Sequence, residues 1–140
     1  MNLDELVRFY ETLTPGDVPR FREFYADDAY FKDPFNEVRG LSAIQRIFNH
    51  MFHQVEEPSF RVVERIADPH GAMLAWEFWF LVRILGRSET HVLRGVTHLR
   101  FAPDGKVAYH RDYWDAAEEL YMKLPGIGLL MRGLRRAFSA

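Results

Sequence analysis

The chain has 140 residues, of which 48% are hydrophobic and 15% aromatic, and its formal net charge is −2 at pH 7. That length suits a single domain, residues 1–140, which buries its own core. The small net charge, with both signs interspersed, does not favour nucleic acid as a partner, and the absence of cysteine excludes disulfides, a thiolate nucleophile and Cys-ligated zinc.

Three helices are predicted in the first part of the chain, each with apolar residues at helical spacing on one face. They cover Leu3 to Leu13, Pro19 to Tyr25 and Ser42 to Val55, with Asp17 and Ser42 as N-caps. Between the last two helices, Tyr30 to Asp33 is predicted as a short extended piece that ends at Asp33-Pro34.

The hydrophobic period then changes to two, which is typical of strands. Turn sequences separate four extended runs, Phe60–Ala67, Ala72–Leu85, Ser88–Phe101 and Lys106–Asp115. Strands in this order favour an antiparallel meander, and helices followed by strands indicate the α+β class. Residues 116–140 are predicted as a helical tail interrupted by Pro125-Gly126.

The longest apolar stretch, Ala72 to Leu85, contains Glu77 and Arg83, and the N-terminus lacks the basic region of a signal peptide. We therefore expect a cytoplasmic protein. The chain also has twelve phenylalanines. Large rigid rings are how proteins line concave apolar sites, although the same rings can simply fill a core.

Several short segments, taken together and in order, resemble the nuclear transport factor 2-like superfamily, in its SnoaL-like and ketosteroid-isomerase-like branch. They are Tyr25-Ala26-Asp27-Asp28-Ala29, Asp33-Pro34-Phe35, Gly40 before a helix, and four strands that end in Tyr113-Trp114. The resemblance covers roughly positions 3 to 115.

This resemblance implies a cone-shaped α+β barrel, with three N-terminal helices packed in the concave face of a curved, mainly antiparallel sheet. It also implies a deep apolar pocket and a homodimer joined through the outer face of the sheet. Members of the superfamily include steroid isomerases, polyketide cyclases, epoxide hydrolases and dehydratases, and others only bind ligands, so the fold does not decide the function.

Asp33 matches the aspartate that serves as general base in the ketosteroid isomerases, and Phe35 would help to desolvate it. Asp-Pro is also a common turn, which is the structural alternative. The oxyanion hole of those enzymes corresponds here to Phe9, with Tyr10 one residue away, and to Thr97. Because strong donors are missing, we do not expect a true steroid isomerase.

In the last predicted strand, His110, Asp112 and Trp114 share one face. The resemblance places Trp114 in the pocket, so this face would point inward. Asp112 would then orient His110, and His110 would exchange a proton with the substrate. The alternative is a buried structural network that involves Arg111.

On the second long strand, Glu77 and Trp79 alternate with Trp76, Phe78 and Phe80, so the register decides which set faces the pocket. The family resemblance places Glu77 and Trp79 inside, next to the other carboxylates. A bulge in the strand would reverse this assignment.

His50 and His53 lie three residues apart on a predicted helix, but no third ligand accompanies them, so we expect no metal site. No phosphate-binding loop or nucleophile elbow is present, and we expect no cofactor. The tail from Ile127 to Phe138 is amphipathic and basic. We expect it to act as a lid over the pocket or as an arm across the dimer, in preference to contact with a membrane.

Two hypotheses about function remain open. In the first, the protein is an enzyme that performs proton transfer, cyclisation, dehydration or hydration on a small, largely apolar cyclic metabolite. Its catalytic residues would be Asp33, His110 and Asp112, and its substrate-binding residues would be Phe9, Tyr10, Phe35, Glu77, Trp79, Thr97 and Trp114. In the second, the same fold is a non-catalytic ligand-binding or dimeric interaction domain.

Overall fold

The computed structural model describes residues 2–119 and 127–139, except for the side chains at positions 83, 84, 127 and 131. In chain order the elements are α1 (Leu3–Glu11), the 3-10 helix η1 (Pro15–Arg20), α2 (Phe21–Phe24), β1 (Tyr25–Lys32), β2 (Glu37–Arg39), α3 (Leu41–Gln54), β3 (Glu56–Asp68), β4 (Gly71–Ile84), β5 (Arg87–Phe101), β6 (Val107–Tyr113), α4 (Ala116–Glu119) and α5 (Ile127–Phe138).

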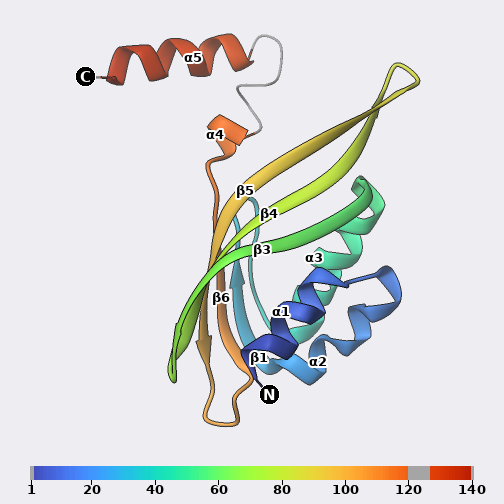
Figure 1. Cartoon of the computed structure of the whole chain (residues 1–140), viewed down its shortest axis with the longest axis vertical. Coiled ribbons are helices and arrows are strands. Elements are labelled where there is room, and N and C mark those ends of the chain that lie inside the picture. Colours follow the sequence, from blue (N-terminus) through green and yellow to red (C-terminus); the bar gives the residue numbers. More distant parts are fainter. Residues whose placement is uncertain (1, 120–126, 140) are drawn as a thin grey trace.

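The strands form one curved sheet of six strands in the order β2-β1-β6-β5-β4-β3. All neighbouring strands are antiparallel except β1 and β6, which are parallel. The helices α1, α2 and α3 lie on the concave side of this sheet (Figure 1). The predicted α+β class and the packing of the helices on one face are therefore confirmed, but the sheet is open, with β2 and β3 at its edges, and is not a closed barrel.

The segment predicted as one helix from Pro19 to Tyr25 divides into three parts. A 3-10 helix comes first, a single α-helical turn follows, and Tyr25 already begins β1. Thr14 is the N-cap, and Asp17 accepts a hydrogen bond from its backbone N–H at 3.0 Å. Asp17 is therefore the N3 residue of a capping box whose N-cap is Thr14, whereas the sequence predicted Asp17 as the N-cap.

The third helix begins one residue earlier than predicted, at Leu41, and its N-cap is Gly40 with no side-chain cap. Gly40 has a φ of 106°, which favours glycine over any residue with a Cβ. Its N–H donates to the backbone carbonyl of Ala29 at 2.9 Å, and this bond attaches the start of α3 to β1.

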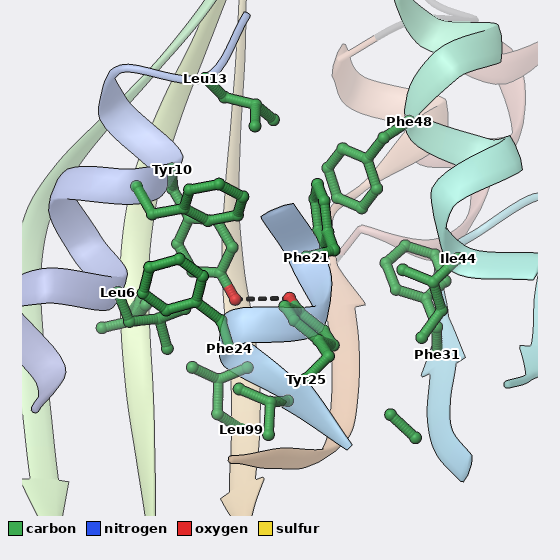
Figure 2. Packing of buried hydrophobic residues seen from close by; sticks show 14 of the residues in the cluster. Leu6, Tyr10, Leu13, Phe21, Phe24, Tyr25, Phe31, Ile44, Phe48 and Leu99 are labelled. Atoms are coloured by element: carbon green, nitrogen blue, oxygen red, sulfur yellow. Dashed lines mark hydrogen bonds between the residues drawn. The ribbon is translucent and has the colours of Figure 1, made fainter. Parts of the chain in front are cut away.

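The main hydrophobic core lies between the helices and the part of the sheet that they cover. Figure 2 shows aromatic rings from α1, α2 and α3 meeting there. Phe9 stacks on Phe24 with ring centroids 4.3 Å apart, and Phe21 lies 4.5 Å from Phe48. A second, smaller cluster of Trp76, Phe78, Phe80 and Leu93 lies on β4 and β5.

The outer face of the sheet carries exposed apolar side chains, namely Ile66, Met73, Trp79, Val96 and Tyr113. Figure 1 shows α5 apart from the sheet and from the other helices, and Leu129, Leu130, Leu134 and Phe138 are exposed on it. The Pro125-Gly126 interruption lies outside the described residues. No helix within the described residues is long and apolar enough to cross a membrane.

Candidate functional site

A cavity of about 720 Å³ lies between α3, the loop after β1 and the concave face of the sheet. Its walls are mainly aromatic and aliphatic, and its polar groups come from β5, β6, the loop and the surface of α3. The residues that line it are Tyr10, Phe31, Asp33, Phe35, Asn36, Val38, Ala43, Arg46, Ile47, Phe48, Asn49, His50, Met51, His53, Gln54, Phe60, Val62, Leu74, Trp76, Phe78, Leu93, Thr97, His110, Asp112 and Trp114.

A continuous chain of hydrogen bonds runs along one wall of this cavity and joins side chains from α1, β1, β4, β5 and β6. The Tyr10 hydroxyl lies 2.5 Å from that of Tyr25, which lies 2.7 Å from His110 Nδ1. On the other side of the ring, His110 Nε2 lies 2.8 Å from Asp112 Oδ1. The same Oδ1 accepts from the Thr97 hydroxyl at 2.5 Å, and the Trp76 indole N–H donates to Thr97 Oγ1 at 2.7 Å.

The chemistry of the two ends gives this chain a direction. An ionised Asp112 can only accept, so His110 Nε2–H donates to it, and a neutral imidazole then accepts at Nδ1 from Tyr25. Tyr25 in turn accepts from Tyr10, and at the other end the Trp76 N–H can only donate. With His110 neutral and Asp112 ionised, every donor in the chain has an acceptor.

The arrangement exchanges the roles expected for His110 and Asp112. The His110 side chain is buried, 4% exposed, and both of its ring nitrogens are bonded to protein groups. Asp112 uses only Oδ1 in the chain, and no group within residues 2–119 and 127–139 bonds to its Oδ2. Asp112, which lines the cavity, thus keeps one oxygen without a partner among the described residues, and His110 holds the other oxygen, whereas the sequence predicted that Asp112 would orient His110.

Asp33 also lies on the cavity wall, but its carboxylate is occupied by the loop that follows it. Oδ1 accepts from the backbone N–H groups of Phe35 and Asn36, both at 2.7 Å, and the Asn36 side-chain amide reaches both carboxylate oxygens at 3.1 Å. This is the turn chemistry of an Asx motif. Asp33 therefore shapes the loop that carries Phe35 to the cavity.

Asp33, Asp112 and Trp114 also border a second cavity of about 420 Å³, which is more polar. Its remaining walls include Lys32, Arg111 and Asp115. Asp112 thus stands between an apolar cavity and a polar vestibule. Phe35 meets Trp114 edge to face, with ring centroids 5.5 Å apart, near this junction.

Three residues predicted to bind substrate do not line the cavity. Phe9 is buried in the core between α1 and α2, and Tyr10 lines the cavity in its place. Glu77 and Trp79 lie on the outer face of β4, where Trp79 is 37% exposed and Glu77 pairs with Arg94 at 4.0 Å. The prediction for β4 was wrong because the alternate positions hold the more apolar set, and burying a charged Glu77 would cost more than exposing one indole.

Tyr10, Phe35, Thr97 and Trp114 do lie on the cavity wall, as do all three predicted catalytic residues. Their action on a ligand stays a prediction. Sequence reasoning missed two members of the hydrogen-bond chain, Tyr25 and Trp76. Tyr25 lies in β1 and not in the predicted helix, and the apolar set Trp76, Phe78 and Phe80 is the sequence signal for the inward face of β4.

Burial is the main cause of the raised pKa of both tyrosine hydroxyls in the chain. For Tyr10 the Asp112 carboxylate adds to this rise, while the hydrogen bond with Tyr25 partly opposes it. For Tyr25 burial again comes first, followed by Tyr10 and Asp112. Both hydroxyls therefore stay protonated near neutral pH and act as hydrogen-bond groups, not as bases.

His50 and His53 are exposed on α3, at the rim of the cavity. Among the described residues, no group of three His, Asp or Glu side chains is arranged to hold a metal ion.

Comparison with known proteins supports this description of the fold. No curated protein matches the chain. One similar solved structure is a candidate SnoaL-like polyketide cyclase from Jannaschia sp. CCS1, with 15% identity and a TM-score of 0.69, covering 83% of this chain and 86% of that one. A second is TsrD from Streptomyces laurentii, with 17% identity and a TM-score of 0.68, covering 88% of this chain and 91% of that one. A third is a protein with a ketosteroid isomerase-like fold from Catenulispora acidiphila, in complex with trimethylamine, with 12% identity and a TM-score of 0.67, covering 84% of this chain and 88% of that one.

At these identities the structural matches establish the fold alone. The family model for the SnoaL-like domain matches residues 6–110, which include most of the helices and strands that build the cavity. The chain therefore belongs to the SnoaL-like domain family.

Proposed function

We propose that the protein binds a small, largely apolar cyclic molecule in the main cavity and that Asp112 exchanges a proton with it. One observation carries this proposal. A carboxylate on an otherwise apolar wall has one oxygen held by Thr97 and His110, while its other oxygen has no partner within the described residues. An open polar atom in an apolar cavity is costly to keep unless a ligand uses it.

The chemistry that suits this geometry is proton transfer at carbon. Asp112 Oδ2 removes a proton from a carbon next to a carbonyl group, and the electron pair of the C–H bond moves into an enolate. The resulting carboxylic acid then returns the proton to a different carbon, which isomerises the molecule. Alternatively, the enolate carbon attacks a second carbonyl and closes a ring, and the carboxylic acid gives its proton to the alkoxide oxygen that this attack forms. His110 and Thr97 keep the carboxylate in one orientation throughout.

A dedicated steroid isomerase is not part of this proposal. The Phe9 position has no hydroxyl and is buried in the core, and the Thr97 hydroxyl already donates to Asp112. Neither can stabilise an oxyanion on a substrate.

The alternative function is a non-catalytic ligand-binding domain with the same cavity. It is favoured by the complete pairing of His110 and of Asp33 with protein groups. In that case the hydrogen-bond chain serves only to join α1, β1 and the centre of the sheet.

The two functions are separated by an assay that does not require the natural substrate. 2-Tetralone, a small cyclic ketone, exchanges its α-protons in D2O, and NMR follows the loss of their signals. We expect the wild-type protein to accelerate this exchange and Asp112→Asn to lose about a hundredfold of that acceleration while 2-tetralone still binds. Asp28→Asn, at an exposed aspartate of β1, is the matched control and should leave the rate unchanged.

Bound 2-tetralone with no acceleration, or equal rates in the wild type and Asp112→Asn, would establish the binding-domain alternative. Native mass spectrometry of the freshly purified protein complements the assay, because a retained ligand would identify the substrate class directly.

We further propose that the protein is a homodimer joined through the outer face of the sheet. The exposed side chains of Ile66, Met73, Trp79 and Val96 give this face more apolar surface than isolated exposed residues would. Sedimentation velocity at micromolar concentration should show a dimer for the wild type and a monomer for Val96→Lys. Leu85→Lys, at the fully exposed tip of the β4–β5 hairpin, should remain dimeric, and a monomeric wild type contradicts the proposal.

A further inference from the structure

The helix α3 presents two different stripes of side chains to the main cavity. Ala43, Ile47 and Met51 are half-buried and form an apolar stripe. Arg46, His50 and His53 are exposed, line the same cavity and follow one another at spacings of four and three residues. That spacing places them on one face of the helix, so they form a basic rim beside the apolar wall.

The basic rim has no partner in the protein as far as the structure describes it. Within residues 2–119 and 127–139, Arg46, His50 and His53 form no hydrogen bond or ion pair. By contrast, Arg20 and Lys32, on the surface of the same domain, are paired with carboxylates. The donors at the rim are therefore free to meet a ligand.

Charge is unevenly distributed around the cavity. Among the described residues, the acidic side chains that line it are Asp33, from the loop after β1, and Asp112, from β6, while the one guanidinium is that of Arg46 on α3. The Asp33 carboxylate is already satisfied by N–H donors of its own loop. A ligand thus meets an open carboxylate oxygen at the sheet and unpaired basic groups at the helix.

We propose that the ligand is a cyclic organic acid, whose carboxylate binds Arg46, with His50 and His53 as further donors, while its ring system fills the aromatic cavity and its reacting carbon faces Asp112. This inference rests on the proposed function and narrows its substrate class. The planar guanidinium presents paired N–H groups that match the two oxygens of a carboxylate.

A cationic amine is the main competing ligand, since aromatic rings and a carboxylate together suit an ammonium group. An amine would have to pair with Asp112 Oδ2, and this would occupy the oxygen that the proposed reaction needs. It would also bring the positive charge of the ammonium group near the Arg46 guanidinium, which repels it. Both consequences favour the acid.

Three small probes of similar shape test the proposal by isothermal titration calorimetry at pH 7. They are 2-naphthoic acid, its uncharged amide and 2-naphthylmethylamine. We expect the acid to bind wild type about fivefold more tightly than the amide, which is the upper range for an exposed ion pair, and the amine to bind most weakly. Arg46→Gln should lower the affinity for the acid to that for the amide and leave the amide unaffected.

Arg8→Gln, at an exposed arginine of α1 away from the cavity, is the control and should keep the preference for the acid. The inference is overturned if the acid binds no better than the amide, if the amine binds best, or if Arg46→Gln weakens acid and amide equally. The proposed function would still stand after any of these outcomes, provided that the amide binds the wild type and that Asp112→Asn no longer accelerates the proton exchange of 2-tetralone. If no probe binds the wild type, both proposals are contradicted.

Discussion

Two regions on the concave side of the sheet hold similar aromatic side chains, but one region is packed core and the other is a cavity wall. Beneath α1, η1 and α2 the rings are fully enclosed, and Phe21 is 0% exposed. On β4 and β5, Phe78 is also nearly buried, 9% exposed, but it faces the cavity. The difference shows that aromatic side chains on the concave side of the sheet become core or cavity wall according to whether another element packs on them.

The largest expected effect comes from comparing a phenylalanine in each region. Phe21→Ala should lower the free energy of unfolding by about 3–5 kcal/mol, because it opens a void among packed rings. Phe78→Ala should cost only about 1–2 kcal/mol, since its ring lacks packing partners on the cavity side, and it should weaken ligand binding more than Phe21→Ala does. Urea denaturation measures both. Equal losses would show that the cavity wall is packed as tightly as the core.

Gly95→Ala tests the packing of the cavity wall by adding a methyl group, whereas the two phenylalanine variants remove side-chain atoms. A Cβ there would lie 2.5 Å from Cζ2 and 2.6 Å from Cη2 of Trp76, and 3.1 Å from the Cβ of Trp114. Gly95→Ala should therefore displace the Trp76 ring, cost about 1–3 kcal/mol and change the tryptophan fluorescence. Gly16→Ala, whose nearest contact would be 3.8 Å away, is the control. An unchanged spectrum would mean that the indole does not lie on Gly95.

The hydrogen-bond chain lies where the two regions meet, and Tyr25→Phe cuts it. This change removes the group that joins Tyr10 to His110, so two buried polar atoms lose a partner. We expect a loss of about 1–2 kcal/mol in the free energy of unfolding. In a Tyr25→Phe background, Tyr10→Phe should lower the free energy of unfolding by less than Tyr10→Phe does in the wild type. The reason is that the Tyr10 hydroxyl has already lost its hydrogen bond to Tyr25.

The matched control for that cycle is Tyr30→Phe, which removes an exposed hydroxyl bonded to Glu37 at 2.9 Å. It should cost less than about 0.5 kcal/mol. Additive losses for Tyr10→Phe and Tyr25→Phe would show that the two tyrosines are not coupled.

The smallest effect is a dependence on alkaline pH. Burial raises the pKa of Tyr10 and Tyr25 in the folded protein, whereas in the unfolded chain both ionise near pH 10. Above pH 10 the folded state thus holds more protons than the unfolded state, and stability falls as pH rises, by about 0.8 kcal/mol per tyrosine at pH 10.5. Below about pH 9 the two tyrosines contribute almost no pH dependence.

Urea denaturation between pH 8 and 10.5 measures this slope. The double variant Tyr10→Phe/Tyr25→Phe should lose less stability over the range than the wild type does. An identical slope in both proteins would show that the tyrosines do not stay protonated in the folded state.

Much of the candidate site followed from the residue pattern of β6, where alternation places His110, Asp112 and Trp114 on one face. The roles of these residues did not follow. His110 lines the cavity, but its Nδ1 is not available to a ligand because Tyr25, 85 residues earlier in the chain, is bonded to it. Distance in sequence hides such a partner, and the segment Tyr25 to Ala29 contains two aspartates, which are poor strand formers.

The order of helices and strands, the apolar face of each helix and the turns between the last four strands followed from the amino-acid sequence, because these depend on local periodicity and turn chemistry. The parallel pairing of β1 with β6 and the contact of Tyr25 with His110 emerged only in the folded chain. Both join segments that lie far apart in the sequence, and local periodicity carries no signal for such contacts.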